Sequence, residues 1–338
     1  MTVRIGINGF GRIGRNFVRA ARLLGADVEV VAVNDLTSPE TLAHLLKYDS
    51  THGRFDGPVT VEGDTLVLDS GPVAVLAEKD PKALPWADLG VDVVIESTGR
   101  FTSKETAAAH IDAGASRVII SAPGTGVDAT FVVGVNDDLF DPATDVVVSN
   151  ASCTTNCFVP MVKVLDDAFG IDVGLMTTVH AYTNDQNLLD LPHKDLRRAR
   201  AAAVNIVPAS SGAARATSLV LESMKGRLDG AALRVPIPDG SITDFTVMIP
   251  GEITVDQVNA AFAAAAAAGP LSKVLVYTED PIVSSDIVGS RASCTFDAGL
   301  TMVMQSASGV TLVKVSGWYD NEWGYANRLV DLALIVGA

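Results

Sequence analysis

The chain has 338 residues, of which 48% are hydrophobic and 19% are charged, a composition that excludes a disordered protein and predicts two globular domains. The formal net charge is −15, which argues against a nucleic-acid partner, because phosphate backbones are bound by clustered Lys and Arg. A small anionic substrate is compatible with this charge only if the few arginines gather in one pocket.

Short apolar runs alternate with amphipathic segments in the first half of the chain. This succession predicts an α/β domain with a parallel sheet and right-handed helical crossovers. Between Gly53 and Leu76, Gly, Pro and Asp interrupt shorter runs that we expect to form a hairpin. The expected strands are Val3–Ile7, Val28–Val33, Val91–Ile95, Arg117–Ser121 and Val146–Ser149, and the expected helices are Arg12–Leu24, Pro39–Lys47 and Lys104–Ala113.

A different pattern follows Ser152. We expect a helix over Thr154–Phe169, a strand over Val173–His180 and then a long polar segment, Tyr182–Asn205, without clean periodicity. The later runs alternate with a two-residue period, which is typical of antiparallel strands. The second half is therefore predicted to be an α+β domain with a mixed, largely antiparallel sheet. The runs are Leu233–Val235, Ser241–Ile249, Val274–Tyr277 and Val310–Ser316, and a helix is expected over Asn321–Val336.

No part of the sequence has the pattern of a targeting leader or a membrane span. The chain begins with a strand-like run, and the Ala-rich stretch Ala260–Ala268 is too short to cross a bilayer. The three cysteines do not suggest a disulfide framework, because Cys294 is far from Cys153 and Cys157 in the sequence. We therefore expect a cytoplasmic protein with one functional thiol, no membrane partner and no metal site.

A glycine motif directly follows the first expected strand. Residues Gly9–Gly14 read Gly-Phe-Gly-Arg-Ile-Gly, and such glycines allow a tight turn and a close approach of the backbone to a pyrophosphate at a helix N-terminus. Alone, the motif is a weak signal, because a plain glycine turn can have the same pattern. The second strand ends at Asp35, an acid about 20 positions further on, where a carboxylate can bind ribose hydroxyls. Together these features predict a Rossmann-type parallel-sheet domain that binds NAD rather than NADP, although Asp35 could also cap a helix or a turn.

The segment Ser149–Cys157 lies between an expected strand and an expected helix. Cys153 would lie at the helix N-terminus, where the helix dipole stabilises a thiolate nucleophile, whereas Cys157 is expected to be a small buried residue. His180 ends the next strand and is the candidate base for the hydroxyl proton of a thiol–aldehyde adduct. The other histidines, His44, His52, His110 and His193, are expected to be surface residues of helices or loops.

Five motifs occur together and in order along the chain. They are Ile7–Arg15 (Ile-Asn-Gly-Phe-Gly-Arg-Ile-Gly-Arg), Ser149–Cys157 (Ser-Asn-Ala-Ser-Cys-Thr-Thr-Asn-Cys), His180–Gln186 (His-Ala-Tyr-Thr-Asn-Asp-Gln), Lys194–Ala201 (Lys-Asp-Leu-Arg-Arg-Ala-Arg-Ala) and Trp318–Tyr325 (Trp-Tyr-Asp-Asn-Glu-Trp-Gly-Tyr). With them, the chain closely resembles phosphorylating, NAD-dependent glyceraldehyde-3-phosphate dehydrogenase of the bacterial type over essentially its whole length.

The resemblance implies a reaction and its catalytic groups. Cys153 would attack the aldehyde of D-glyceraldehyde 3-phosphate to form a hemithioacetal, and His180 would remove the hydroxyl proton as hydride leaves for NAD. Inorganic phosphate would then attack the resulting thioester and release 1,3-bisphosphoglycerate, as in glycolysis or gluconeogenesis. The implied ligands are Thr183, Arg198 and Arg234 for the substrate phosphate, and Ser152, Thr154, Ser211 and Gly212 for the attacking phosphate.

The resemblance also implies the cofactor contacts and the domain organisation. Residues 1–152 and 318–338 would form the NAD-binding domain, and residues 153–317 the catalytic domain. The segment Tyr182–Asn205 would pack between the subunits of a homotetramer, and Leu191-Pro192 fits the NAD preference expected from Asp35. The implied cofactor contacts are Gly9, Gly11, Arg12, Ile13, Asp35, Lys79, Ser121 and Asn321.

Some positions depart from the usual pattern of the family, and they leave alternatives open. Ser211 stands where Thr is more common, and Lys79 stands where Arg is frequent. With Ala209 near the nucleophile, the first departure is compatible with a second copy of the enzyme that tolerates a cysteine-directed inhibitor. Another alternative is erythrose-4-phosphate dehydrogenase, a relative in which water takes the acyl group. A non-catalytic NAD-binding scaffold would have lost Cys153, His180 or the arginines, and all are present.

Overall fold

The computed structural model describes residues 2–307 and 309–338. Contacts between Cα atoms divide the chain into two compact units, Met1–Ser152 with Ala326–Ala338, and Cys153–Tyr325. The division near the C-terminus falls after Tyr325 because the last strand, β19 (Val310–Tyr319), still belongs to the sheet of the second unit. The chain therefore leaves the first unit once and returns to it within the last helix, α9 (Trp323–Gly337).

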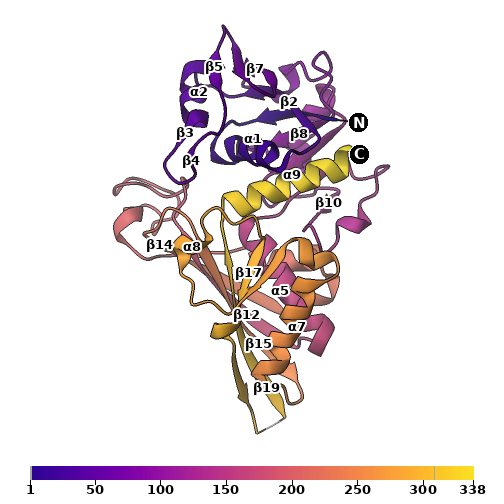
Figure 1. The fold of residues 1–338 in the computed structure, drawn as a ribbon, viewed down its shortest axis with the longest axis vertical. Coiled ribbons are helices and arrows are strands. Elements are labelled where there is room, and N and C mark those ends of the chain that lie inside the picture. The colour runs from indigo at the N-terminus through magenta and orange to yellow at the C-terminus, as the bar shows by residue number, and fades with distance from the viewer. Residues whose placement is uncertain (1, 308) are drawn as a thin grey trace. The chain divides into compact units, whose positions relative to one another are not determined.

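The first unit is built on a nine-stranded sheet (Figure 1) with the order β10-β11-β9-β8-β1-β2-β7-β6-β5. The strands from β10 to β7 pair in parallel, and only β5 and β6 are antiparallel. The predicted Rossmann-type parallel sheet is therefore confirmed, and the hairpin expected between Gly53 and Leu76 extends its edge. The strands of this sheet are β1 (Val3–Asn8), β2 (Val28–Asn34), β5 (Val59–Val61), β6 (Thr65–Leu68), β7 (Gly71–Leu76), β8 (Val93–Glu96), β9 (Arg117–Ile120), β10 (Ala129–Thr130) and β11 (Val147–Ser149), and β3 (Tyr48–Asp49) and β4 (Gly53–Arg54) form a separate two-stranded sheet.

Two predicted helices of this unit, α1 (Arg12–Leu24) and α2 (Pro39–Lys47), have the predicted bounds. Helix α1 begins after Gly11 and ends where Gly25 adopts the left-handed conformation, at φ 58°, which glycine reaches without a Cβ penalty. The third predicted helix is divided into α3 (Lys104–Ala107) and α4 (Ala109–Asp112).

The expectation that His110 is a surface residue was wrong. The side chain of His110 is 0% exposed, and its two ring nitrogens lie 3.0 Å from Trp86 Nε1 and 3.0 Å from Glu96 Oε2. The sequence pattern failed here because the partners of this imidazole lie 24 and 14 residues away along the chain.

The second unit contains an eight-stranded mixed sheet with the order β13-β14-β12-β15-β19-β17-β16, and β18 pairs with β19. Helix α5 packs on the sheet at β15, β17 and β19, and α7 packs beside α5 (Figure 1). The strands are β12 (Val173–Ala181), β13 (Val207–Ser210), β14 (Leu228–Val235), β15 (Ser241–Pro250), β16 (Leu275–Thr278), β17 (Cys294–Asp297), β18 (Met302–Gln305) and β19, and the helices are α5 (Cys153–Phe169), α6 (Ala213–Ala216), α7 (Val255–Ala267) and α8 (Ser284–Ile287).

The mixed, largely antiparallel sheet was predicted, but the direction of two runs was not. The strand β16, predicted as an antiparallel run at Val274–Tyr277, pairs in parallel with β17, and β14 pairs in parallel with β12 as well as antiparallel with β13. A two-residue period reports that one face of a strand is buried, and it does not report the direction of the neighbouring strand.

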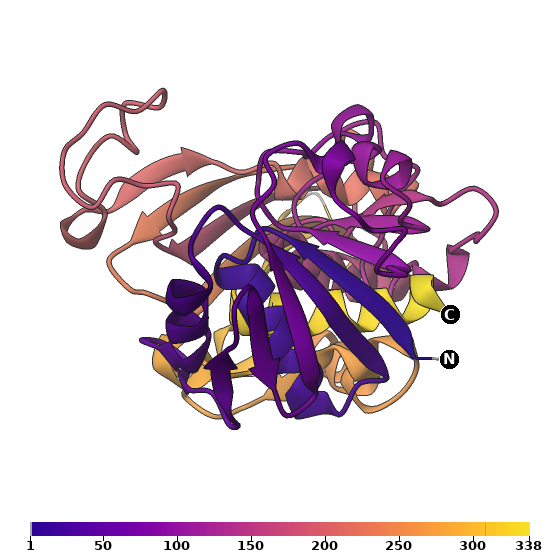
Figure 2. The same ribbon diagram turned by 90° about the horizontal axis from the view of Figure 1, so that it is seen from above.

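The segment after β12 contains no helix or strand over residues 182–201 and extends from the sheet of the second unit as a long loop, drawn in pink in Figure 2. In the part of the chain that the structure describes, no helix has both the length and the apolar character needed to cross a membrane.

Candidate active site

A cavity of about 600 Å³ lies over the carboxyl ends of the parallel strands in the first unit. In open α/β sheets this is where ligands bind. Four of the predicted cofactor residues line the cavity, namely Gly9, Gly11, Asp35 and Lys79.

The glycines of the predicted motif have different roles in the fold. Gly9 has a φ of 93°, and a Cβ there would lie 2.7 Å from the backbone of Ser97, while a Cβ at Gly14 would lie 2.4 Å from the carbonyl oxygen of Gly9. At Gly11 a Cβ would meet no atom within 4 Å. Gly9 and Gly14 are thus required by the turn itself, whereas Gly11 leaves room for a bound group such as a pyrophosphate.

The carboxylate of Asp35 is held by the backbone on both of its oxygens. The Phe10 N–H donates to Oδ2 over 3.0 Å, and the Thr37 N–H donates to Oδ1 over 3.1 Å. This arrangement fixes the side chain at the rim of the cavity with remaining acceptor capacity for ribose hydroxyls. The residues present therefore fit a dinucleotide such as NAD.

The other predicted cofactor residues do not line this cavity. Arg12 donates two hydrogen bonds to the Asp49 carboxylate, at 2.9 and 3.1 Å. Ile13 lies beside it in the first turn of α1, and Ser121 follows β9. Burial would raise the pKa of Asp49, but hydrogen bonds from Arg12 and from the backbone of His52 and Thr51 outweigh it and lower that pKa.

A buried polar network beneath the cavity was missed by the sequence analysis. Asn34 Nδ2 donates to Asn8 Oδ1 over 2.7 Å, and Asn8 Nδ2 donates to Glu96 Oε2 over 2.6 Å. Glu96 also accepts from His110 and from Thr98. Asn8, Asn34 and Glu96 each end a parallel strand. A polar residue at the end of an apolar run is therefore the sequence feature from which this network could have been predicted.

In the second unit, Cys153 is the first residue of α5. It follows a turn in which Ala151 has a φ of 53°, the only positive φ of a non-glycine residue in the described chain. Burial raises the pKa of the Cys153 thiol, although the charge of Arg234 and the backbone N–H of Thr154 act in the opposite direction. The effect of burial is the larger, so the pKa of the thiol is raised and the thiol form is favoured.

His180, the predicted base, lies beside this thiol, and its Nε2 is 3.4 Å from Cys153 Sγ. Strands β12 and β14 pair in parallel with His180 opposite Arg234, and the guanidinium lies 2.7 Å from His180 Nδ1. Burial and then the charge of Arg234 lower the pKa of His180 to about 3. The imidazole is consequently neutral near pH 7 and carries a single N–H.

Thr154, a predicted ligand of the attacking phosphate, is held by a residue to which the sequence analysis gave no role. Its hydroxyl lies 2.8 Å from the hydroxyl of Tyr319, which also lies 2.8 Å from the hydroxyl of Thr178. Burial raises the pKa of Tyr319, so its hydroxyl stays protonated. Nothing in the local sequence pairs α5 with β12 and β19, so this contact required the tertiary structure.

Thr183 and Arg198, the predicted ligands of the substrate phosphate, meet on Asp185. The Thr183 hydroxyl and the Arg198 guanidinium both donate to its carboxylate. The sequence analysis did not assign a role to this acid. Arg234 contacts His180 instead of this group, and Ser211 and Gly212 immediately precede α6, where the Ala213 N–H donates to the Ser211 hydroxyl.

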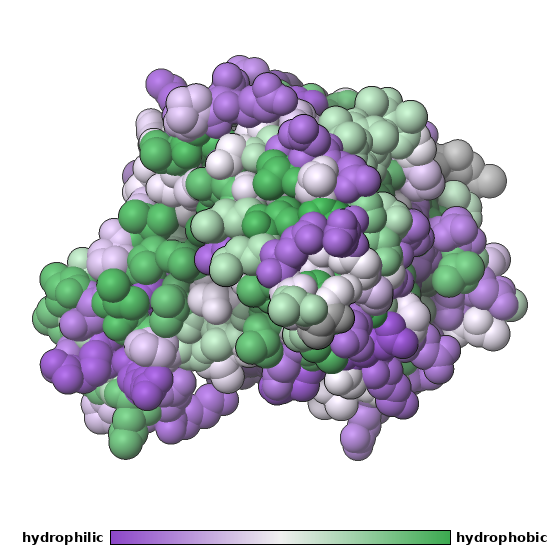
Figure 3. All heavy atoms as spheres, turned by 90° about the horizontal axis from the view of Figure 1, so that it is seen from below, coloured by the Kyte–Doolittle hydropathy of each residue, from purple (hydrophilic) through white to green (hydrophobic). Residues whose placement is uncertain are grey.

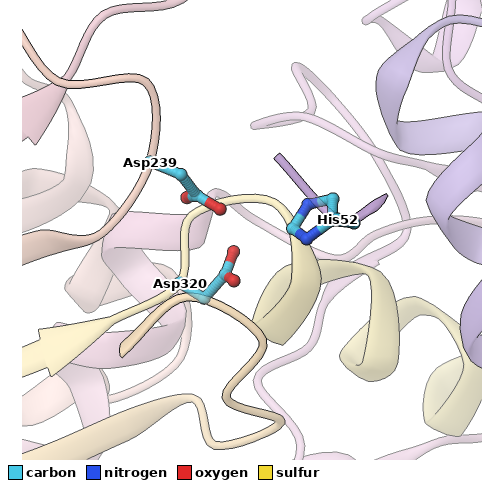
Figure 4. Close-up of side chains that lie close together, drawn as sticks. All are labelled: His52, Asp239 and Asp320. Carbon is cyan, nitrogen blue, oxygen red and sulfur yellow. The ribbon is translucent and has the colours of Figure 1, made fainter. Parts of the chain in front are cut away.

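Asn321 is 5% exposed, and its Oδ1 accepts a 2.7 Å hydrogen bond from Ser241 Oγ. The carboxyl groups of Asp239 and Asp320, two residues before Ser241 and one before Asn321, point toward one another (Figure 4). Burial, together with the negative charges of Asp320 and Glu322, raises the pKa of Asp239. The shift favours the protonated form of Asp239 beside Asp320.

Two family models match the chain. Residues 3–104 match the model described as "Glyceraldehyde 3-phosphate dehydrogenase, NAD binding domain", and residues 152–321 match the model described as "Glyceraldehyde 3-phosphate dehydrogenase, C-terminal domain". The second match alone covers half of the chain and includes Cys153 and His180. The chain belongs to the glyceraldehyde 3-phosphate dehydrogenase family.

Similar full-length proteins carry the name of this family. The chain is 61% identical over 337 residues to "Glyceraldehyde-3-phosphate dehydrogenase" of Streptomyces coelicolor, covering 100% of this chain and 99% of the relative. It is 62% identical over 337 residues to "Glyceraldehyde-3-phosphate dehydrogenase 1" of Streptomyces avermitilis and 60% identical over 345 residues to the dehydrogenase of Mycobacterium tuberculosis, with the same coverage. The resemblance predicted from the five motifs is thus confirmed over the whole length of the family members.

Proposed function

We propose that this chain is the NAD-dependent, phosphorylating enzyme of its family, which converts D-glyceraldehyde 3-phosphate and inorganic phosphate to 1,3-bisphosphoglycerate. The observation that carries the proposal is the 3.4 Å contact between Cys153 Sγ and His180 Nε2 at the start of α5. A thiol beside a neutral imidazole is the arrangement needed for a nucleophile and its base. Bound NAD supplies the hydride acceptor.

The oxidation proceeds on Cys153. Its sulfur attacks the aldehyde carbon and forms a hemithioacetal, whose hydroxyl proton passes to His180 Nε2 as the hydride leaves. The product is a thioester on Cys153. Inorganic phosphate attacks its carbonyl carbon, the bond to sulfur breaks, and the acyl phosphate leaves with the thiolate restored.

The phosphate ligands are those implied by the family pattern. Thr183, Arg198 and Arg234 hold the phosphate of the substrate; the arginine forks suit its oxygens, and on this acidic chain they form a local positive pocket. Thr183 and Arg198 also donate hydrogen bonds to the Asp185 carboxylate, which therefore lies beside that phosphate. The attacking phosphate is held by Ser152, Thr154, Ser211 and Gly212.

NAD is bound by residues 1–152 and 318–338, and residues 153–317 carry the chemistry. The lining of the cavity supports this assignment for Gly9, Gly11, Asp35 and Lys79. Asn321, fixed by Ser241, presents its amide to the nicotinamide carboxamide. Arg12, Ile13 and Ser121 complete the set of cofactor contacts.

The functional form is a homotetramer. Hydrophobic patches lie among polar ones on the face shown in Figure 3, and exposed apolar residues of the second unit include Leu175 on β12 and Met304 on β18, at 68% and 67% exposure. In the long loop Leu188 and Leu196 are 77% and 82% exposed. These exposed apolar side chains support the proposal that part of this surface is buried against a partner. The three free thiols fit a cytoplasmic location.

The test is NADH formation from glyceraldehyde 3-phosphate with and without inorganic phosphate, with Cys153→Ser as the control. We expect strong dependence on phosphate and loss of turnover in the variant. Turnover that is independent of phosphate would instead identify a hydrolytic enzyme such as erythrose-4-phosphate dehydrogenase. No observation on the fold or on the similar proteins favours that alternative or an inhibitor-tolerant second copy.

A further inference from the structure

Three polar atoms meet on the side of His180 that faces away from Cys153. His180 Nδ1 lies 2.7 Å from the carbonyl oxygen of Ala181 and 2.7 Å from Nη1 of Arg234, and the same Nη1 lies 3.1 Å from that oxygen. The register of β12 and β14, which places His180 opposite Arg234, sets this arrangement.

The three contacts cannot all be favourable in one protonation state. A carbonyl oxygen only accepts hydrogen bonds, and a guanidinium only donates them. Each nitrogen of a neutral imidazole donates a hydrogen bond if it carries the proton and accepts one if it does not. If Nδ1 carries the proton, it donates to Ala181, but its hydrogen then faces the Arg234 donor. If Nδ1 is unprotonated, two acceptors, Nδ1 and the Ala181 oxygen, lie 2.7 Å apart, but the Arg234 Nη1 donates to both and its positive charge offsets their repulsion. Arg234 in this position therefore favours the tautomer with an unprotonated Nδ1.

This choice decides what Nε2 can do, because a neutral imidazole has a single N–H. With Nδ1 unprotonated, the proton lies on Nε2, which then faces Cys153 Sγ as a donor. A base must instead present a lone pair at Nε2 to take the hydroxyl proton of the hemithioacetal. The position of Arg234 seen here therefore holds His180 in the tautomer that cannot act as the base.

We propose that Arg234 makes the reaction specific for phosphorylated aldehydes by holding His180 in the inactive tautomer until the substrate phosphate draws the guanidinium away. The proposal rests on the roles of His180 and Arg234 given under the proposed function. When Arg234 leaves, Nδ1 donates to Ala181 and Nε2 becomes free to accept. One proton moves from Nε2 to Nδ1 by exchange with solvent, so the step needs no other reactant.

The structure gives the phosphate an advantage over the imidazole. A phosphate is an anion that can accept two parallel hydrogen bonds from a guanidinium, whereas the neutral imidazole accepts one and carries no opposite charge. Arg234 is only half-buried, and its Nε has no hydrogen-bond partner among the described residues. The buried Nε is therefore an unsatisfied donor in this position, and a move of the guanidinium toward the phosphate would give it an acceptor.

The tautomer can be measured directly by ¹⁵N NMR of the full-length protein labelled at histidine, with the His180 signals assigned from His180→Asn. The probe is glycerol 3-phosphate, which carries the phosphate but no aldehyde. We expect the proton of His180 on Nε2 in the free protein and on Nδ1 with the probe bound. Saturating binding of the probe with the proton still on Nε2, or a proton on Nδ1 from the start, would overturn the proposal.

Two variants separate this role from simple phosphate binding. Arg234→Leu removes the donor, and the His180 proton should lie on Nδ1 even without the probe. Arg198→Leu removes another proposed phosphate ligand that does not contact His180, and its free-state tautomer should match that of the native protein. If both variants keep the native tautomer, Arg234 does not control it.

The kinetic consequence appears with unphosphorylated D-glyceraldehyde. A positioned general base contributes roughly 10²–10⁴-fold to rate. We therefore expect Arg234→Leu to raise the NADH burst rate with D-glyceraldehyde by about 10²-fold, the lower end of this range, while lowering that with glyceraldehyde 3-phosphate. A role in phosphate binding alone predicts no change with D-glyceraldehyde, and that result would contradict the proposal. Failure of the proposed function would appear separately, as absent turnover of glyceraldehyde 3-phosphate by the native protein.

Discussion

The hydroxyl of Tyr319 can be removed to test how the attacking phosphate is held. This hydroxyl is buried and lies 2.8 Å from the hydroxyls of both Thr154 and Thr178. Tyr319→Phe keeps the ring and its edge-on contact with His180, whose centroid is 5.9 Å away. The substitution therefore removes polar contacts and leaves the packing in place.

The size of the effect follows from the bonds that are lost. A neutral hydrogen bond contributes about 0.5–1.5 kcal/mol net. In the variant, the Thr178 hydroxyl can still donate to the carbonyl oxygen of Ile242, 3.3 Å away. The main effect is therefore that the Thr154 hydroxyl loses the partner that orients it. A loss of about 1 kcal/mol corresponds to about a fivefold weaker affinity, and we expect the KM for inorganic phosphate to rise by about that factor.

The NADH burst and the phosphate dependence of steady-state turnover separate the two half-reactions. In Tyr319→Phe we expect an unchanged burst, because Cys153 and His180 are not altered, and a raised KM for phosphate. Thr178→Val serves as the control, since it removes the other contact of the hydroxyl and should change this KM less. An unchanged KM for phosphate, or a burst that falls with it, would refute the reasoning.

Two further predictions concern the first unit. Gly14→Ala should lower both the melting temperature and the affinity for NAD, because a Cβ at Gly14 would lie 2.4 Å from the backbone of Gly9. Gly11→Ala should weaken NAD binding and leave the melting temperature unchanged, because a Cβ at Gly11 would meet no atom within 4 Å. Equal melting temperatures for the two variants would contradict this reasoning. The pKa of Asp49 is held below its usual 3.8, so its ionised form stabilises the fold at neutral pH and that stabilisation is lost as the pH falls below about 3.8. The melting temperature of Asp49→Asn should accordingly lie below that of the native protein at pH 7 and approach it in acid, and a difference that does not depend on pH would exclude the carboxylate as the cause.

Much of the first unit could be predicted because its signals are local. The bounds of α1 follow from the glycines on either side of an amphipathic run, and β1, β2 and β9 follow from short apolar runs. The helix expected over Lys104–Ala113 is nevertheless divided, and His110 within it is buried. Its imidazole bonds to Glu96 on β8, and a sequence period cannot report which element faces a helix.

The second unit shows the limit of the same approach in its sheet. Alternation of apolar residues located β15 and β19, but β16 runs parallel to its neighbour β17, contrary to the expectation. The strand β17 itself is buried at all four residues and therefore has no alternation to detect.

By itself, the sequence determined the chemistry available to this protein. The glycine turn before α1, Asp35, Cys153 at the start of α5 and His180 at the end of β12 are all short-range features, and each identifies a functional group from its immediate neighbours. The family resemblance added the proposed phosphate ligands, because long motifs in a fixed order predict a fold and its site together.

Only the tertiary structure decided how those groups act on one another. The register of β12 and β14 brings Arg234 to the far side of His180, and the packing of α5 on the second sheet brings Tyr319 to Thr154. Asp185 joins Thr183 to Arg198 in the same way. Strand register and helix packing are set by side chains distant in the sequence, so the partner of a catalytic group, and with it the proton that the group carries, becomes defined only when the chain is folded.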